Sequence, residues 1–215
     1  MNLLEKVLDL IFLPKCGVCE KLGNDYLCDS CYQKLKKIAI GKKKIVEDKS
    51  YTEFMYLFDY QGIIQEKILQ YKFHDKSYLD KMFGKLFVNY EKSCDFLKSY
   101  DIIIPVPIHT KRKTKRGYNQ CELIAKYISK QLDMVMYTDV LVKKKDTISQ
   151  STLGRMERKS NVKDAYKVQN IVKIKQKKIV ILDDVYTTGS TIEECSKVLK
   201  SAGVSKIGVI TIAKD

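Results

Sequence analysis

Residues 179–191 read IVILDDVYTTGST, and this stretch decides the fold that we expect for the chain. Its four leading apolar residues, Ile179 to Leu182, indicate a buried strand of a parallel sheet. Two carboxylates, Asp183 and Asp184, stand where that strand is expected to end. A short turn follows, and the apolar spacing after it indicates an amphipathic helix. Because ligands of open α/β sheets lie beyond the carboxyl ends of the strands, we expect a binding site here.

The turn after the acidic pair is rich in hydroxyl groups and contains one glycine: Thr187, Thr188, Gly189, Ser190 and Thr191. A helix that starts here offers free N–H groups and a positive dipole end to a phosphate. Paired carboxylates bind ribose hydroxyls or a hydrated Mg²⁺ ion. The stretch therefore predicts a site for a phosphorylated ribose; the alternative is an ordinary strand, turn and helix with a good N-terminal cap. The competing nucleotide motifs G-x-x-x-x-G-K-[ST] and G-x-G-x-x-G are absent.

The segment from Asp183 to Thr191 resembles the phosphoribosyl pyrophosphate (PRPP) loop of type I phosphoribosyltransferases. In that family, two acids hold the ribose hydroxyls and the loop after them wraps the 5′-phosphate. The resemblance implies that Asp183 and Asp184 are the catalytic pair and that residues 187–191 bind the phosphate. It also implies PRPP as the ligand, with Mg²⁺ as its cofactor.

Four of the seven cysteines form a regular pattern, C-x2-C-x8-C-x2-C, made by Cys16, Cys19, Cys28 and Cys31. Two C-x-x-C pairs at this spacing are typical of a tetrahedral Zn²⁺ site with four thiolate ligands. Four protein ligands close such a site, so we expect a structural zinc and no catalysis at the metal. A redox-active C-x-x-C is the alternative. Paired disulfides are not expected, because the N-terminal residues do not read as a secretory signal.

The chain is strongly basic, with a formal net charge of +14, and all but four of its 40 basic residues are lysines. A polyanionic partner explains this charge, and solvated lysine-rich surfaces are the alternative. The four arginines are the exceptions, and they fall in two short clusters: Arg112, Arg116, Arg155 and Arg158. Because a guanidinium grips phosphate oxygens in pairs, we expect both clusters to face phosphates. The alternative explanations of the two arginine clusters are chance and a role in structural salt bridges.

The remaining sequence predicts strands alternating with helices, which favours a parallel α/β sheet flanked by helices. We expect two parts: residues 1–45, an N-terminal helix with the cysteine module, and residues 46–215, a phosphoribosyltransferase-like domain. Patterning predicts strands at 51–60, 101–107 and 206–213, helices at 63–71, 78–90 and around 123–132, a loop at 109–117, and a mobile loop with a short helix at 143–162. The N-terminal apolar stripe is expected to dock on the domain, with membrane contact as the alternative.

Three segments in this order resemble the ComF family (competence protein F-like): PVPIHTKRKTKRGYNQ from Pro105, residues 150–161, and ILDDVYTTGST. That family also carries a four-cysteine zinc module at its amino end, and the resemblance covers roughly residues 10–213. It implies that the pyrophosphate is lined by His109, Thr110, Lys111 and Arg112. It further implies that a second group closes over the pyrophosphate or touches a second ligand: Arg116, Gln120, Arg155 and Arg158.

The ComF resemblance implies a PRPP-binding protein that acts in natural transformation or DNA uptake. Single-stranded DNA and DNA-uptake or helicase-type proteins are then the expected partners. The alternative is an active phosphoribosyltransferase on an unidentified acceptor, and the sequence leaves turnover open because it shows no evident acceptor subsite. No run of eighteen apolar residues occurs, so no transmembrane segment is expected. We expect a cytoplasmic location, with the inner face of the membrane as the alternative.

Overall fold

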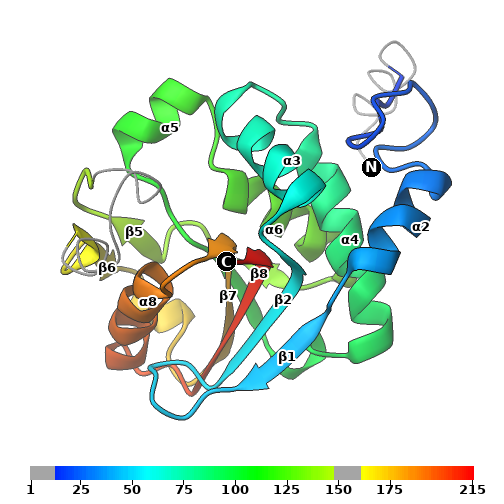
Figure 1. Cartoon of the computed structure of the whole chain (residues 1–215). Helices are drawn as coiled ribbons and strands as arrows, with labels where there is room; N and C mark the ends of the chain where they lie inside the picture. The colour runs from blue at the N-terminus through cyan, green and yellow to red at the C-terminus, as the bar shows by residue number, and fades with distance from the viewer. Residues whose placement is uncertain (1–12, 148–160) are drawn as a thin grey trace.

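The computed structural model describes residues 13–147 and 161–215, and a six-stranded sheet with the order β1-β2-β8-β7-β3-β4 forms its centre (Figure 1). All neighbouring strands run parallel except β1, which pairs antiparallel with β2 at one edge. The strands span Lys42–Ile45 (β1), Glu53–Asp59 (β2), Ile102–Pro105 (β3), Val135–Met136 (β4), Lys178–Tyr186 (β7) and Lys206–Lys214 (β8). The predicted α/β architecture is confirmed, and the antiparallel edge strand is a feature that the sequence did not predict.

Helices cover both faces of this sheet, and a second, two-stranded sheet stands beside it (Figure 1). Helices α2, α3, α4 and α6 share one core cluster, whereas α8 and the small sheet share the other. The helices span Asp29–Ile38 (α2), Gly62–Phe73 (α3), Leu79–Cys94 (α4), Thr110–Arg116 (α5), Gln120–Leu132 (α6) and Ser190–Ser201 (α8). The small sheet pairs Leu141–Lys143 (β5) with Tyr166–Val168 (β6), and two 3₁₀ turns span Leu97–Ser99 (η1) and Ile171–Lys173 (η3).

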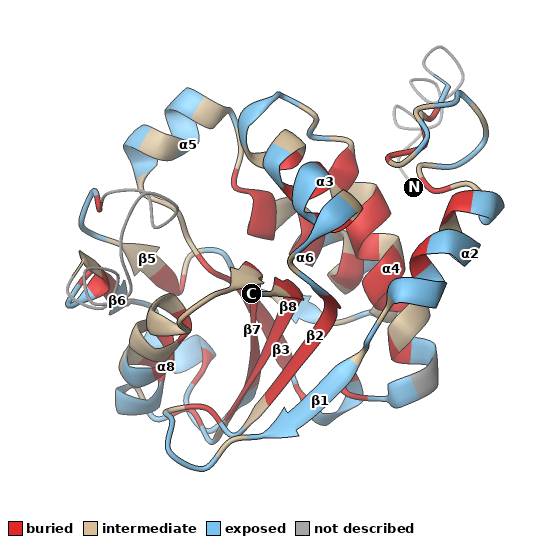
Figure 2. Cartoon of the chain, viewed as in Figure 1, coloured by how far each residue is buried: buried red, intermediate tan, exposed pale blue. Residues whose placement is uncertain are grey.

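Strand β7 is buried on both faces, which explains its uninterrupted apolar run. Val180 and Leu182 belong to the core under α4 and α6, whereas Ile179 and Ile181 belong to the core under α8. All four side chains are fully buried (Figure 2). Alternate residues of a strand point to opposite faces, so a strand covered on both sides needs an apolar residue at every position.

The sequence pattern predicted that this strand ends at the acidic pair. In the structure it continues to Tyr186. Its neighbour β8 is equally long and pairs with it through Tyr186 and Lys214, so the ladder extends past both carboxylates on that side. On the other side, β3 ends at Pro105, which pairs with Leu182. Beyond this point no strand of the described ranges pairs with β7 on the β3 side, and the acidic pair lies there.

The predicted loop at 109–117 was also wrong, because residues 110–116 form helix α5. The His109 side chain caps its first turn by accepting from the Lys111 N–H at 3.4 Å, and Gly117 ends the helix at a φ of +83°. A left-handed residue at this place is the usual helix stop, and glycine adopts it without strain. The other predicted strands and helices outside residues 143–162 are confirmed with shifted ends.

The division of the chain at residue 45 stays a prediction, and β1, which precedes it, pairs with β2 in the main sheet. The N-terminal stripe and most of the predicted loop at 143–162 lie outside the described residues. Among the helices of the described ranges, none is long and apolar enough to cross a membrane.

Candidate functional site

A cavity of about 390 Å³ opens at the carboxyl edge of the sheet, where β7 outruns β3. Asp183 and Asp184 form its floor, and helices α3 and α5 with strand β5 contribute walls. Four cationic side chains are among the described residues that line it: Lys72, Arg112, Arg116 and Lys143. The cavity thus combines an acidic floor with cations, as a ligand that carries both hydroxyls and phosphates requires.

The two carboxylates differ in their partners. Asp184 is buried, and both of its oxygens are occupied: Lys72 Nζ lies 2.8 Å from Oδ1, and Gln120 Nε2 donates to Oδ2 at 2.7 Å. Asp183 accepts from the backbone N–H of Asp184 at 2.9 Å and from the thiol of Cys121 at 3.6 Å. One carboxylate is therefore paired with a cation, and the other accepts only from neutral donors among the residues that the structure describes.

Burial raises the pKa of Asp183 to about 7, and the charge of the adjacent Asp184 adds to this rise. Burial also opposes the charge on Lys72, but its ion pair with Asp184 outweighs that effect and raises the pKa of the ammonium. The Lys72 ammonium therefore stays charged, while Asp183 exchanges its proton near neutral pH. A buried carboxyl group with a strongly raised pKa in a cavity is typical of functional sites.

The turn after β7 presents the start of α8 to the cavity. Gly189 is the residue before the helix and has a φ of +74°. A Cβ there would collide with the hydroxyl of Tyr186, so glycine is required both by the backbone angle and by space. The Thr188 and Ser190 hydroxyls are hydrogen-bonded to each other at 2.8 Å. Thr187 and Thr191 line the cavity on either side of this turn.

The structure brings seven of the sequence-predicted residues to the cavity wall: Arg112, Arg116, Gln120, Asp183, Asp184, Thr187 and Thr191. Six others are not among the described residues that line it: His109, Thr110, Lys111, Thr188, Gly189 and Ser190. His109 caps α5 and faces Asp146, with Nδ1 3.7 Å from Oδ1, and the Lys111 ammonium lies 3.8 Å from the same carboxylate. Arg155 and Arg158 lie outside the described residues.

Sequence reasoning missed Lys72 and Lys143. Lys72 stands near the C-terminal end of α3, and Lys143 ends β5, where burial, with the repulsion of Arg112 added, lowers the pKa of its ammonium. Neither had a signal in the sequence, because the chain places lysine almost everywhere that it needs a cation. Only the fold reveals which lysines face the acidic pair.

The four cysteines of the N-terminal pattern also come together. Their sulfur atoms all lie within 4.8 Å of one another, and the Sγ atoms of Cys19 and Cys28 are 3.9 Å apart. Ligands at 2.3 Å in a tetrahedron are about 3.8 Å apart, so this cluster has the dimensions of a four-thiolate metal site. The backbone supports it with a tight knuckle, in which the Glu20 N–H donates to the Cys16 carbonyl at 2.9 Å. The cluster could hold a metal ion such as zinc.

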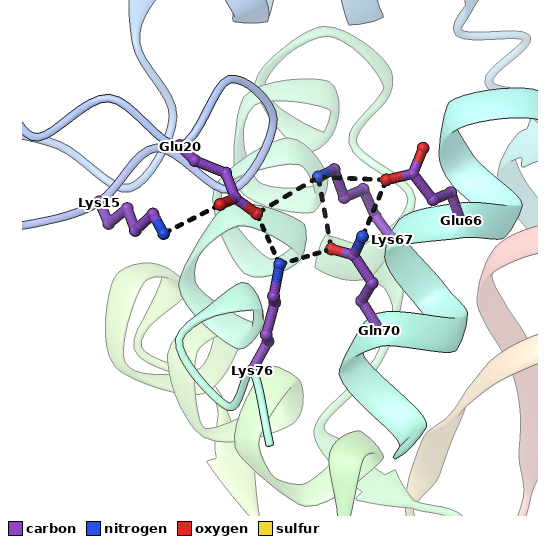
Figure 3. Close-up of polar contacts among 6 residues, drawn as sticks. All are labelled: Lys15, Glu20, Glu66, Lys67, Gln70 and Lys76. Carbon is purple, nitrogen blue, oxygen red and sulfur yellow. Dashed lines mark hydrogen bonds and ion pairs between the residues drawn. The ribbon is translucent and has the colours of Figure 1, made fainter. Parts of the chain in front are cut away.

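An ion-pair network joins this knuckle to α3, the helix that carries Lys72 to the cavity (Figure 3). The carboxylate of Glu20 lies 2.9 Å from Lys15, 2.5 Å from Lys76 and 4.0 Å from the buried Lys67. Hydrogen bonds from Lys76 and Lys15 lower the pKa of Glu20 to about 2. One partly buried glutamate thus connects the cysteine cluster to the helix beside the acidic pair.

Residues 119–215, which contain the acidic pair and the turn after it, match the phosphoribosyl transferase domain family. Together with the parallel sheet and the position of the cavity, this match assigns the chain to the type I phosphoribosyltransferase fold.

The resemblance to the ComF family is confirmed along nearly the whole chain. The chain is 29% identical to "Competence protein F" of Haemophilus influenzae, over 94% of this chain and 85% of that protein. It is 26% identical to "DNA utilization protein YhgH" of Escherichia coli strain K12, over 94% and 83%. It is also 28% identical to "Competence protein ComFC" of Streptococcus pneumoniae, over 74% and 66%.

Proposed function

We propose that the cavity binds PRPP with Mg²⁺ and that the protein acts in DNA uptake. One observation carries the first part: the acidic pair, the start of α8 and four cations from distant parts of the sequence line or border one cavity. PRPP contains a ribose diol, a 5′-phosphate and a pyrophosphate, and each has a chemically matching wall in this cavity. The second part is supported by relatives whose names refer to competence and DNA utilisation.

Asp183 and Asp184 are the groups that would hold the ribose hydroxyls, because carboxylates accept hydrogen bonds from both members of a diol. The 5′-phosphate would rest at the first turn of α8, between Thr187 and Thr191, where the N–H groups and the helix dipole favour an anion. A divalent cation bound with the ligand would neutralise the pyrophosphate and draw on the same carboxylates.

The pyrophosphate would lie against the arginine side of the cavity. Arg112 is oriented by a hydrogen bond from its Nη2 to the Thr147 carbonyl at 2.8 Å, and Arg116 hydrogen-bonds the Gln120 side chain. Lys143, the last residue of β5, adds an ammonium to the cavity lining. Because a guanidinium offers paired N–H donors in a fixed fork, these arginines suit adjacent phosphate oxygens better than lysines would.

We also propose that the cysteine cluster holds a structural Zn²⁺, since four thiolates close the coordination sphere. A site of reduced thiolates suits a reducing compartment, which supports a cytoplasmic location. The basic surface would contact single-stranded DNA, and partner proteins of the uptake machinery would complete the function.

The experiment that tests the pocket is calorimetric titration of Mg-PRPP into the full chain and into the double variant Asp183→Asn with Asp184→Asn. We expect the double variant to lose roughly a hundredfold in affinity, because each side chain loses its negative charge and one of its two acceptor oxygens. The matched control is Asp95→Asn with Asp139→Asn, which removes two exposed, lysine-paired acids outside the cavity. Equal affinity of the two double variants would show that the ribose is not held at the acidic pair.

DNA contact is tested separately with a single-stranded oligonucleotide at several salt concentrations. We expect binding whose affinity falls steeply with added salt, because lysines that neutralise phosphates release counterions. A flat salt response would contradict a contact through the basic surface. Release of pyrophosphate from PRPP in the presence of an acceptor would identify the alternative function, an active transferase.

A further inference from the structure

The segment that connects β1 to β2, residues 46–52, contacts the chain on both sides of the turn after β7. The Tyr51 hydroxyl lies 2.9 Å from the hydroxyl of Tyr186, the last residue of β7 and 135 positions further along the chain. Ser50 donates from its backbone N–H and from its hydroxyl to the Glu193 carboxylate, at 3.2 and 2.9 Å. Because Glu193 belongs to the first turn of α8, one distant segment holds the chain before and after the turn.

The Tyr186 side chain transmits the first of these contacts to the turn. Its ring packs on Phe54 of β2, with the ring centroids 4.4 Å apart. Its hydroxyl lies so close to Gly189 that a Cβ at this glycine would collide with it. Tyr51 is only 2% exposed, so water competes little for its hydrogen bond to Tyr186. The position of the Tyr186 ring therefore supports the backbone of the turn at the residue before α8.

The second contact decides where a negative charge points. An acid in the first turn of a helix interacts favourably with the helix dipole, but it also competes with a phosphate for the same N-terminus. Both oxygens of Glu193 accept from Ser50, and Glu193 is not among the described residues that line the cavity. The contact thus directs this carboxylate to the β1–β2 segment and leaves the helix start beside Thr187 and Thr191 to an anion.

We infer that Tyr51 and Ser50 are positioning residues, which hold the turn after β7 in the conformation that a phosphate requires. The inference rests on the proposed function, since that function places the 5′-phosphate at this turn. Neither residue is among the described residues that line the cavity, so both act through Tyr186 and Glu193.

The physical reason is preorganisation of the turn. The N–H groups of a helix start bind an anion tightly only where they already point to one place. Gly189, at a φ of +74°, belongs to the residue type with the widest choice of backbone conformations, so this turn gains from support outside itself. A turn that leaves this conformation must be ordered again when a phosphate binds, and that ordering lowers the affinity.

This role predicts which ligands depend on the two residues. Ribose 5-phosphate needs the turn, whereas pyrophosphate is expected on the arginine side of the cavity, beside Arg112 and Arg116. Loss of support should therefore weaken the binding of ribose 5-phosphate and leave the binding of pyrophosphate unchanged. A role in stability alone would affect both ligands alike, or neither.

The test measures ribose 5-phosphate and Mg-pyrophosphate by calorimetry on the full chain, on Tyr51→Phe and on Ser50→Ala. We expect each variant to bind ribose 5-phosphate about fivefold more weakly, the effect of one lost hydrogen bond, and Mg-pyrophosphate with unchanged affinity. Ser50→Thr should keep the affinity of the unmodified chain, because it retains the hydroxyl. The matched control is Tyr100→Phe, which removes another buried tyrosine hydroxyl, one that donates to Glu53 at 2.6 Å, outside the described lining of this cavity. Both affinities should be unchanged in this control.

Amide exchange tests the same role without a ligand. The Glu193 N–H donates to the Gly189 carbonyl at 2.9 Å, so its exchange rate reports whether the turn opens. We expect this amide to exchange about fivefold faster in Tyr51→Phe, as the loss of one hydrogen bond implies. Amides in the centre of β7 and β8 should keep their rates, and Tyr100→Phe should keep the rate of Glu193.

An unchanged exchange rate at Glu193, or an unchanged affinity for ribose 5-phosphate, would overturn the inference while the proposed function stands. Equal losses for both ligands, or the same losses in Tyr100→Phe, would also overturn it, because each would mean a general effect on the fold. If ribose 5-phosphate fails to bind the unmodified chain, the proposed phosphate site fails, and the exchange rate at Glu193 alone decides whether Tyr51 holds the turn. Because phenylalanine keeps the buried ring, Tyr51→Phe should fold, which thermal melting checks.

Discussion

The cysteine module, residues 13–38, and the cavity at the end of β7 are built in opposite ways. Four residues within one short segment form the cysteine cluster, and its tight knuckles are local backbone turns. The cavity instead takes Lys72 from α3, Arg112 from α5, Lys143 from β5 and the acids from β7. A local site depends on spacing along the chain, whereas a distributed site depends on where the strands of the sheet end.

The largest expected effect follows from emptying the metal site that we propose for the module. Treatment with a zinc chelator, or replacement of Cys28 and Cys31 by serine, should unfold the module, because a structural zinc bound by this cluster would supply about 10 kcal/mol or more of binding free energy. Amide exchange should then show loss of protection in residues 13–38 and retained protection in β7 and β8. Loss of protection throughout the chain would mean that the two regions are one cooperative unit.

The buried ion pair of the cavity should give the next largest effect. Lys72→Met leaves Asp184 buried without its cation, so we expect the free energy of unfolding to fall by about 3 kcal/mol. Lys98→Met is the matched control, because it breaks an ion pair with Asp95 whose side chains are 74% and 62% exposed. That control should leave the free energy of unfolding nearly unchanged, as chemical denaturation would measure. Equal losses would mean that Asp184 is better solvated than its contacts indicate.

A smaller effect should depend on pH. The pKa of Asp183 rises from 3.8 in the unfolded chain to about 7 in the folded one, so the folded state holds a proton that the unfolded state has lost between these values. Stability should therefore fall as the pH rises through this window. Asp183→Asn has no carboxyl group to titrate at this position, so its stability should not fall in this way. Its melting temperature should be about 2–4 °C above that of the unmodified chain at pH 8, and the difference between the two melting temperatures should be smaller at pH 5. A difference in melting temperature that is the same at both pH values would contradict a buried, protonated Asp183.

The smallest effect concerns the connection between the two regions. Glu20→Gln removes the charge that joins Lys15, Lys67 and Lys76 (Figure 3). Because Glu20 is only partly buried, we expect the free energy of unfolding to change by less than about 1 kcal/mol. We also expect replacement of Cys28 and Cys31 by serine to weaken Mg-PRPP binding slightly in the unmodified chain and less so in the Glu20→Gln background, since α3 carries Lys72. Calorimetry of the four variants in the same Mg²⁺ concentration measures this, and identical responses would show that the regions are independent.

Sequence patterns predicted the acidic pair, the turn after it and the cysteine cluster, because each lies within one short stretch. They predicted the long strands and helices for the same reason: apolar residues at a strand or helix period record which faces are buried. They failed at α5, where seven mostly charged residues have no apolar period, and the helix depends on the His109 cap and the Gly117 stop. They also failed at β4, β5 and β6, which have two or three residues each.

The sequence by itself determined that an acidic pair is followed by a hydroxyl-rich turn and that four cysteines form a cluster, since both are properties of neighbouring residues. The tertiary structure alone decided that Asp184 is paired with Lys72, that Asp183 accepts from neutral donors of the described residues, and that Phe73 lines the same cavity. These residues come from α3 and β7, more than a hundred positions apart in the chain. Only the order of the strands, and the place where β3 stops short of β7, brings them into one cavity.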